Sequence, residues 1–172
     1  MLGGYRSGQT GLTVNQLAMP SQVRILFLPP FFFYPPTMSD APRERVFVYG
    51  TLKRGFCNHA LLHEAEFIGE ARTVSRFGLY LGADDYAPDG EEIPYLYRHP
   101  KVTDEAMSVH GEVWEISPTT LRQLDRLEGH PDWYRRESIQ VQINSEAPME
   151  VQTYLRPGSP PDAYRPIESG CF

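Results

Sequence analysis

A glycine that follows four strand-forming residues marks the first place where this chain could bind a ligand. Val46 to Tyr49 are β-branched or aromatic, which predicts a strand that ends at Gly50. Gly50 carries no Cβ, so its backbone can adopt positive φ and can be approached closely by a ligand. If the chain turns there, the N–H groups of Gly50, Thr51 and Leu52 could converge on a carboxylate or phosphate. The same pattern is common at ordinary sheet edges, and the spacing is not that of a P-loop.

A glutamate at the predicted end of a helix is the second candidate. Glu128 precedes Gly129 and follows Leu124 to Leu127. The negative end of a helix dipole raises the pKa of a nearby carboxyl group, and burial raises it further. A carboxyl group that titrates nearer neutrality can accept and return a proton. A solvated glutamate at a helix end fits the same pattern. Composition alone gives equal standing to four others: Glu64, Glu66, Glu112 and Glu115.

The remaining polar candidates are weaker. Cys57 and His59 are two residues apart, which suggests a thiol and a base but more often reflects an incidental cysteine. Lys53 and Arg54 could attract an acidic substrate, although a solvent-exposed pair is the ordinary interpretation. His110 lies in an alternating segment and is predicted to face away from the core, so we assign it no role.

Two helices are predicted beside these candidates. Ser117 and Pro118 are a typical N-cap and first-turn proline, and Gly129 is a typical residue after a helix end. Leucines at every third position between them give this helix one apolar stripe. Asn58 is a plausible N-cap for a shorter helix that runs to Glu64.

Most other segments read as short strands. The runs are 46–49, 67–74 with a glycine break, 77–81, 93–96, 108–116, 136–143 and 150–155. Pro94 within an apolar run implies a sheet edge, a bulge or a cis bond. The Asp84–Glu92 segment is acidic and turn-rich, so a loop is expected, and the tail after Pro160 is expected to wrap the surface or fray. About six short strands with two or more helices predict an α+β domain around a small mixed sheet or barrel.

Composition limits the classes of function. A chain of 172 residues suits one folded domain, and a formal charge of −6 argues against nucleic acid as the main partner. Two distant cysteines match no metal or redox spacing, so we expect free thiols, no cofactor and a reducing, cytoplasmic location. No apolar run is long enough for a membrane span.

Residues 1–37 differ from the rest of the chain. Residues 1–39 contain no Asp or Glu and only Arg6 and Arg24, and a Pro/Phe cluster ends the segment. A targeting segment, a membrane-surface or partner-binding segment, and an extension from an upstream start before Met38 all remain open. We predict a disordered extension over residues 1–37 and one domain over residues 38–172.

Four short motifs in order carry a resemblance to a known family. They are Val-Tyr-Gly-Thr-Leu-Lys-Arg-Gly from Val48 followed by Asn58-His59, Ile-Pro-Tyr-Leu from Ile93, Gly-Glu-Val from Gly111, and Leu-Asp-Arg-Leu-Glu-Gly from Leu124 followed by Tyr134-Arg135-Arg136. Together they resemble the γ-glutamylcyclotransferase-like proteins, most closely the γ-glutamylamine cyclotransferase branch. The similarity runs from about Arg45 to about Arg156.

The resemblance implies a fold, a reaction and a set of site residues. The main chain of Tyr49, Gly50, Thr51 and Leu52 would hold the α-carboxylate end of a γ-glutamyl substrate, and Tyr134 would contact it. Glu128 would move the proton while the substrate's own amine attacks its γ-carbonyl, releasing 5-oxoproline and an amine. The nucleophile belongs to the substrate, so the scheme requires no protein nucleophile and no metal. A related enzyme that acts on other γ-glutamyl compounds, or a non-catalytic γ-glutamyl-binding protein, is the alternative.

Overall fold

The computed structural model describes residues 42–83 and 92–172. The predictions for residues 1–37, and for the acidic loop up to residue 91, lie outside the described residues. In the described part, the helices are too short or too polar to cross a membrane.

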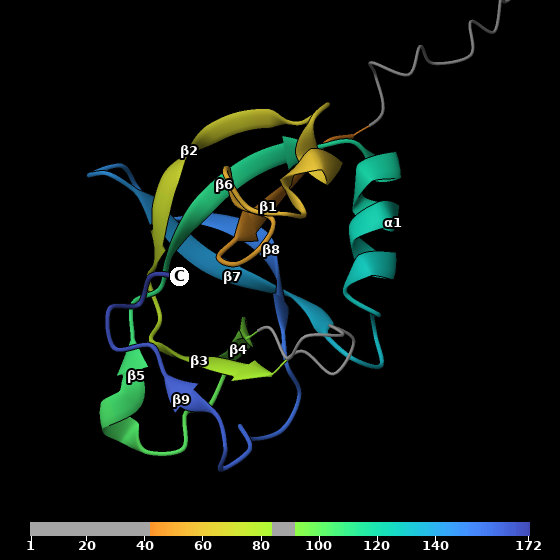
Figure 1. Cartoon of the computed structure of the whole chain (residues 1–172). Helices are drawn as coiled ribbons and strands as arrows, with labels where there is room; N and C mark the ends of the chain where they lie inside the picture. The colour runs from red at the N-terminus through yellow and green to blue at the C-terminus, as the bar shows by residue number, and fades with distance from the viewer. Residues whose placement is uncertain (1–41, 84–91) are drawn as a thin grey trace, which may run out of the picture. The chain divides into compact units, whose positions relative to one another are not determined.

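Five strands form a closed barrel. In spatial order they are β1 (Glu44–Val48), β6 (His110–Ile116), β2 (Glu66–Thr73), β7 (Arg135–Ile143) and β8 (Met149–Leu155). Neighbouring strands are antiparallel except β1 and β8, which close the barrel in parallel at Val46 and Gln152. These strands fill the upper part of Figure 1, with the small second sheet below them.

The second sheet is built from the middle of the chain and its tail. Its strands are β3 (Phe77–Ala83), β4 (Glu92–Tyr97), β5 (Ala106–Met107) and β9 (Arg165–Pro166), with β3 paired to the other three. β4 lies at the edge of this sheet, which confirms one of the positions that Pro94 predicted. The main chain of Arg156, just after β8, donates to Leu96 in β4 and so joins the sheet to the barrel.

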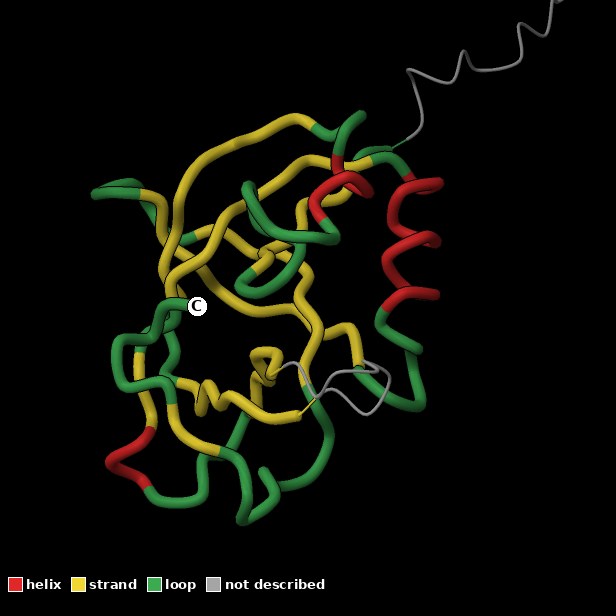
Figure 2. The backbone as a smooth tube through the Cα atoms, in the orientation of Figure 1, coloured by secondary structure: helices red, strands yellow, loops and turns green. Residues whose placement is uncertain are grey.

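The predicted long helix is present, and the predicted short one forms as a 3-10 helix without its side-chain cap. Helix α1 (Pro118–Leu127) begins after Ser117, whose side chain accepts from the Thr120 amide, and it is followed by Gly129 at a φ of 59°. The segment from Asn58 is only a 3-10 turn, η1 (His59–Leu62), and Asn58 makes no side-chain cap. A second 3-10 turn, η2, spans Thr103–Glu105, and Figure 2 shows all three in red. The side-chain amide of Asn58 donates to Oγ1 of Thr51 at 3.0 Å.

The core has two parts, one on each face of the barrel wall. On β1, Phe47 belongs to one cluster with Val113 and Val141, whereas Val46 packs in the other with Trp114. Both faces of β1 are therefore buried, which explains its continuous apolar sequence. The observed architecture confirms the predicted α+β fold with a small barrel.

Candidate active site

A pocket of about 460 Å³ opens where β1 ends, beside the end of α1. The pocket is lined by the six residues that the family resemblance assigned to the site: Tyr49, Gly50, Thr51, Leu52, Glu128 and Tyr134. Its other lining residues are Phe47, Val48, Asn58, Ile93, Pro94, Tyr95, Arg126, Leu127, Gly129, Trp133 and Tyr154. Apolar and aromatic side chains predominate, and the volume is in the range that binds small molecules.

Of the two predicted reasons for Gly50, positive φ is wrong, and close packing against Pro94 is a reason that the sequence did not indicate. Its φ is not positive, so the glycine is not there to adopt a left-handed conformation. A Cβ added at Gly50 would lie 2.7 Å from Cγ of Pro94, a rigid ring atom. The loop after β1 therefore packs directly against β4, and only glycine fits.

The main-chain carbonyl groups of this loop all have hydrogen-bonding partners. The Gly50 carbonyl accepts from the Lys53 amide at 3.0 Å, the Thr51 carbonyl accepts from the Asn58 amide at 3.0 Å, and the Leu52 carbonyl lies 3.1 Å from Nδ1 of His59. Within residues 42–83 and 92–172, the amides of Gly50, Thr51 and Leu52 have no acceptor. Three available amides beside a pocket suit an anionic ligand.

Glu128 is placed by the end of α1. Its amide donates to the Leu124 carbonyl at 2.9 Å, and Gly129 then turns the chain. The chain returns so that the Tyr134 amide donates to the Glu128 carbonyl at 3.2 Å. This closed turn brings Glu128 and Tyr134 into one pocket.

The electrostatics of Glu128 suit proton transfer. Burial raises the pKa of its carboxyl group from 4.5 to about 7. No hydrogen-bond partner holds the carboxyl group among the residues that the structure describes. A carboxyl group with such a pKa exchanges protons readily near neutral pH.

The pocket tyrosines stay protonated. Burial, followed by the nearby Glu128 charge, raises the pKa of Tyr49 well above its ordinary value. Burial likewise raises the pKa of Tyr134, with Tyr49 and Glu128 adding to the effect. The Tyr49 hydroxyl donates to the Tyr154 carbonyl at 2.9 Å, and the Tyr134 ring stacks on Tyr95 with centroids 6.2 Å apart. Both phenols can therefore act only as neutral hydrogen-bonding groups.

Comparison with known proteins identifies the family. The family model described as γ-glutamyl cyclotransferase, AIG2-like, matches residues 46–172. The chain belongs to this family. It is 35% identical to a putative γ-glutamylcyclotransferase of Methanocaldococcus jannaschii, over 67% of this chain and 87% of that protein. It is 34% identical to a γ-glutamylaminecyclotransferase of Bos taurus, over 68% of each chain.

Solved structures agree with this assignment. A crystal structure of an AIG2-like protein from Mus musculus is 31% identical, with a TM-score of 0.58 over 70% of this chain and 82% of that chain. The γ-glutamylcyclotransferase fold and the family resemblance are thereby confirmed. The family's enzymatic function is supported for this chain, and its substrate within the family is a separate question.

Several lining residues of this family member were assigned no role at the site from the sequence. Asn58 and Tyr95 belong to two of the family motifs but carried no chemical assignment, and Trp133 belongs to none of the motifs. Only the folding of β4 and of the 129–134 turn onto β1 brings them together. Their spacing in sequence carries no information about this.

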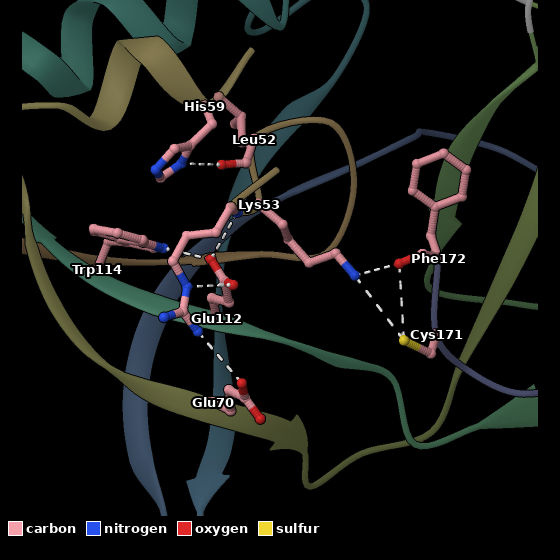
Figure 3. A network of polar contacts seen from close by, with 9 residues as sticks. Leu52, Lys53, His59, Glu70, Glu112, Trp114, Cys171 and Phe172 are labelled. Carbon is pink, nitrogen blue, oxygen red and sulfur yellow. Dashed lines mark hydrogen bonds and ion pairs between the residues drawn. The ribbon is translucent and has the colours of Figure 1, made fainter. Parts of the chain in front are cut away.

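The weaker candidates lie outside the pocket. Cys57 and Cys171 are unpaired and exposed, and His59 contacts the Leu52 carbonyl and Trp114. Lys53 is 9% exposed, so its interpretation as a solvated residue is wrong. Its Nζ donates to the Phe172 carbonyl, which shows that the tail returns to the barrel (Figure 3). Among the described residues, no group of three or more His, Cys, Asp or Glu could hold a metal ion.

The raised pKa of Glu128 predicts a stability effect that is independent of catalysis. The pKa of Glu128 is higher in the folded protein than in the unfolded chain, so the folded state is favoured while the carboxyl group is protonated. This contribution to the free energy of unfolding is complete below about pH 4.5 and is lost as the pH rises through about 7. The whole shift corresponds to about 3 kcal/mol, which we discount to about 2 kcal/mol because the side chain is partly exposed. Glu128→Gln should therefore be about 2 kcal/mol more stable than wild type at about pH 8.5, and nearly equal to it at about pH 4.5.

Urea unfolding at both pH values measures this difference. Glu146→Gln is the control, because Glu146 is exposed in the turn between β7 and β8. A stability difference between Glu128→Gln and wild type that does not change with pH would contradict the prediction.

Proposed function

We propose that this protein is a cyclotransferase that cleaves γ-glutamylamines, such as γ-glutamyl-ε-lysine, to 5-oxoproline and a free amine. The observation that carries the proposal is one pocket that combines a carboxyl group of pKa about 7 with three available main-chain amides. The amides of Gly50, Thr51 and Leu52 would hold the substrate α-carboxylate. Tyr134, which lines the same pocket, would donate a hydrogen bond to the substrate.

The proposed reaction moves one proton through Glu128. Its carboxylate takes a proton from the α-ammonium group, and the free amine forms a bond to the γ-carbonyl carbon. The tetrahedral intermediate then breaks its bond to the original amide nitrogen. Glu128 returns the proton to this nitrogen, so that a neutral amine departs. The ring nitrogen gives up its second proton to solvent, which leaves the neutral five-membered lactam. Holding the substrate folded for ring closure supplies much of the rate, because the reaction is intramolecular.

The wall of the pocket supports an amine leaving group. Tyr95, Trp133 and Leu127 line it near Glu128, and these side chains suit the methylene groups of an alkylamine. In γ-glutamyl-alanine or glutathione, a carboxylate or peptide group lies one carbon from the scissile nitrogen. Burying that polar group against these side chains costs free energy unless it pairs with a cation such as Arg126, which also lines the pocket.

The test is 5-oxoproline release by the full chain from γ-glutamyl-ε-lysine, γ-glutamyl-alanine and glutathione. We expect kcat/KM for γ-glutamyl-ε-lysine to exceed that for the other two by at least about tenfold. A preference for γ-glutamyl-alanine or glutathione would assign the same chemistry to a different acceptor. Binding of all three compounds without 5-oxoproline release would contradict the enzymatic proposal and indicate a γ-glutamyl-binding protein.

A further inference from the structure

A buried carboxylate lies behind the loop that follows β1. Glu112 is 7% exposed and comes from β6. Its Oε2 accepts from the Arg54 amide at 3.2 Å and from the Trp114 indole at 3.0 Å. Its Oε1 accepts from Nε of Arg54 at 3.0 Å, as Figure 3 shows around the labelled Glu112. One carboxylate thus holds both the main chain and the side chain of a single loop residue.

These contacts keep Glu112 ionised inside the protein. Burial by itself raises the pKa of Glu112, but the hydrogen bonds from Arg54 and Trp114 and the Arg54 charge outweigh it, so the pKa lies below its ordinary value. A buried carboxylate is tolerated only when it is paired and hydrogen-bonded. A substitution of Glu112 by a neutral residue therefore removes the anion and its pairing with Arg54 together.

Arg54 is also held by the neighbouring strand. Its Nη2 lies 3.3 Å from Oε1 of Glu70 in β2, and its guanidinium group lies 4.0 Å from the centre of the Phe67 ring. The loop end is therefore anchored to two barrel strands. The Glu70 pair is exposed and contributes little, whereas the contacts with Glu112 are partly buried because the Glu112 side chain is only 9% exposed.

The Arg54 amide, which Glu112 holds, lies two residues after the segment from Gly50 to Leu52 whose amides are available. Lys53 bonds back to Gly50, and Arg54 follows directly, so the position of the Arg54 main chain limits the turn from Gly50 to Lys53. His59 holds the Leu52 carbonyl and packs on Trp114 with ring centroids 5.2 Å apart. Glu112 and Trp114 thus support the loop from the side of the barrel (Figure 3).

We propose that Glu112 is a positioning residue that orders the loop amides for the α-carboxylate of the substrate. It acts through Arg54 and does not line the pocket. This inference rests on the proposed function, because it takes 5-oxoproline as the ligand whose carboxylate the loop binds. It assigns a role to a residue that composition alone could not distinguish from other glutamates, although Glu112 lies in one of the four family motifs.

The test compares two ligands that differ only in charge. The dissociation constants of 5-oxoproline and of its neutral amide, 5-oxoprolinamide, are measured by titration calorimetry on wild type and Glu112→Gln. A glutamine has one oxygen and one NH2 group, so at least one of the Arg54 bonds must be lost. We expect wild type to bind 5-oxoproline more tightly than 5-oxoprolinamide. In Glu112→Gln the ratio of the two dissociation constants should fall about tenfold, while the affinity for 5-oxoprolinamide changes less than about twofold.

Glu115→Gln is the matched control. Glu115 lies on the same strand, is partly exposed and pairs with Arg45, away from the loop. It should keep the wild-type preference for the acid. Equal weakening of both ligands by Glu112→Gln would show a general structural role and overturn the inference, as would a wild type that binds the two ligands equally.

A second variant covers the case in which Glu112→Gln does not fold. Arg54→Lys keeps the charge and the main-chain bond to Glu112 but loses the Nε contact. We expect a loss of about threefold in the preference for the acid, and no change would overturn the inference. Binding constants do not depend on turnover, so the failure of this inference is distinguishable from a failure to release 5-oxoproline.

Discussion

Replacing Glu128 by glutamine should abolish 5-oxoproline release while leaving the fold intact. Glutamine has nearly the same size but cannot accept or return a proton, so we expect kcat to fall about 10²- to 10⁴-fold. The variant should still bind 5-oxoproline, because Gly50, Thr51 and Leu52 supply the expected anion site. Initial rates on the preferred γ-glutamyl compound measure the loss.

The pH profile of the wild type provides the second part of this test. Glu128 must be ionised to take the first proton, so kcat/KM should fall as pH decreases through about 7, the pKa to which burial raises this group. Glu146→Gln should keep both the rate and the profile. Activity of Glu128→Gln within about threefold of wild type would exclude Glu128 as the proton carrier.

Replacing Gly50 by alanine should damage the loop without changing any polar group. The new Cβ would lie 2.7 Å from Cγ of Pro94, and neither the strand nor the proline ring can move cheaply. The loop must shift away from β4, and a displacement of about 1 Å in a positioning element can cost about 10²-fold in rate. We therefore expect kcat/KM to fall about 10²-fold, mainly through KM for the carboxylate-bearing substrate.

A compensating variant makes this prediction specific. Pro94→Ala removes the Cγ atom that causes the clash, so Gly50→Ala combined with Pro94→Ala should recover at least about tenfold of the lost kcat/KM. Pro94→Ala alone is the control, because it removes the same ring atoms without adding a Cβ at Gly50. If the double variant is no more active than Gly50→Ala alone, contact with Pro94 is not the reason for the glycine.

Local features of the fold could be predicted from the sequence. The Ser117 cap, the Gly129 turn and the alternation of Ile139, Val141 and Ile143 all depend on neighbours along the chain. Each was found as predicted. The short helix after Asn58 forms as a 3-10 helix and ends at Leu62, two residues earlier than predicted. Its predicted side-chain cap is absent, and the Asn58 side-chain amide donates to Thr51 Oγ1, a contact that local propensity does not include.

The barrel itself depends on contacts between distant segments. Its closure joins β1 to β8 in parallel, and β6 buries both of its faces, with Val113 in one cluster and Trp114 in the other. An alternating pattern predicts one buried face, so it could not show that the second face is covered as well. The helix and strand count therefore predicted the class but not the closure.

The sequence by itself determined the strand that ends before Gly50, the helix that ends at Glu128, and the family through four ordered motifs. Only the tertiary structure decided the chemistry of the site. Glu128 has a pKa of about 7 because residues from other elements bury it, and Glu112 differs from other glutamates because Arg54 and Trp114 enclose it. Burial and pairing are set by distant segments in contact, so no spacing along the chain could reveal them.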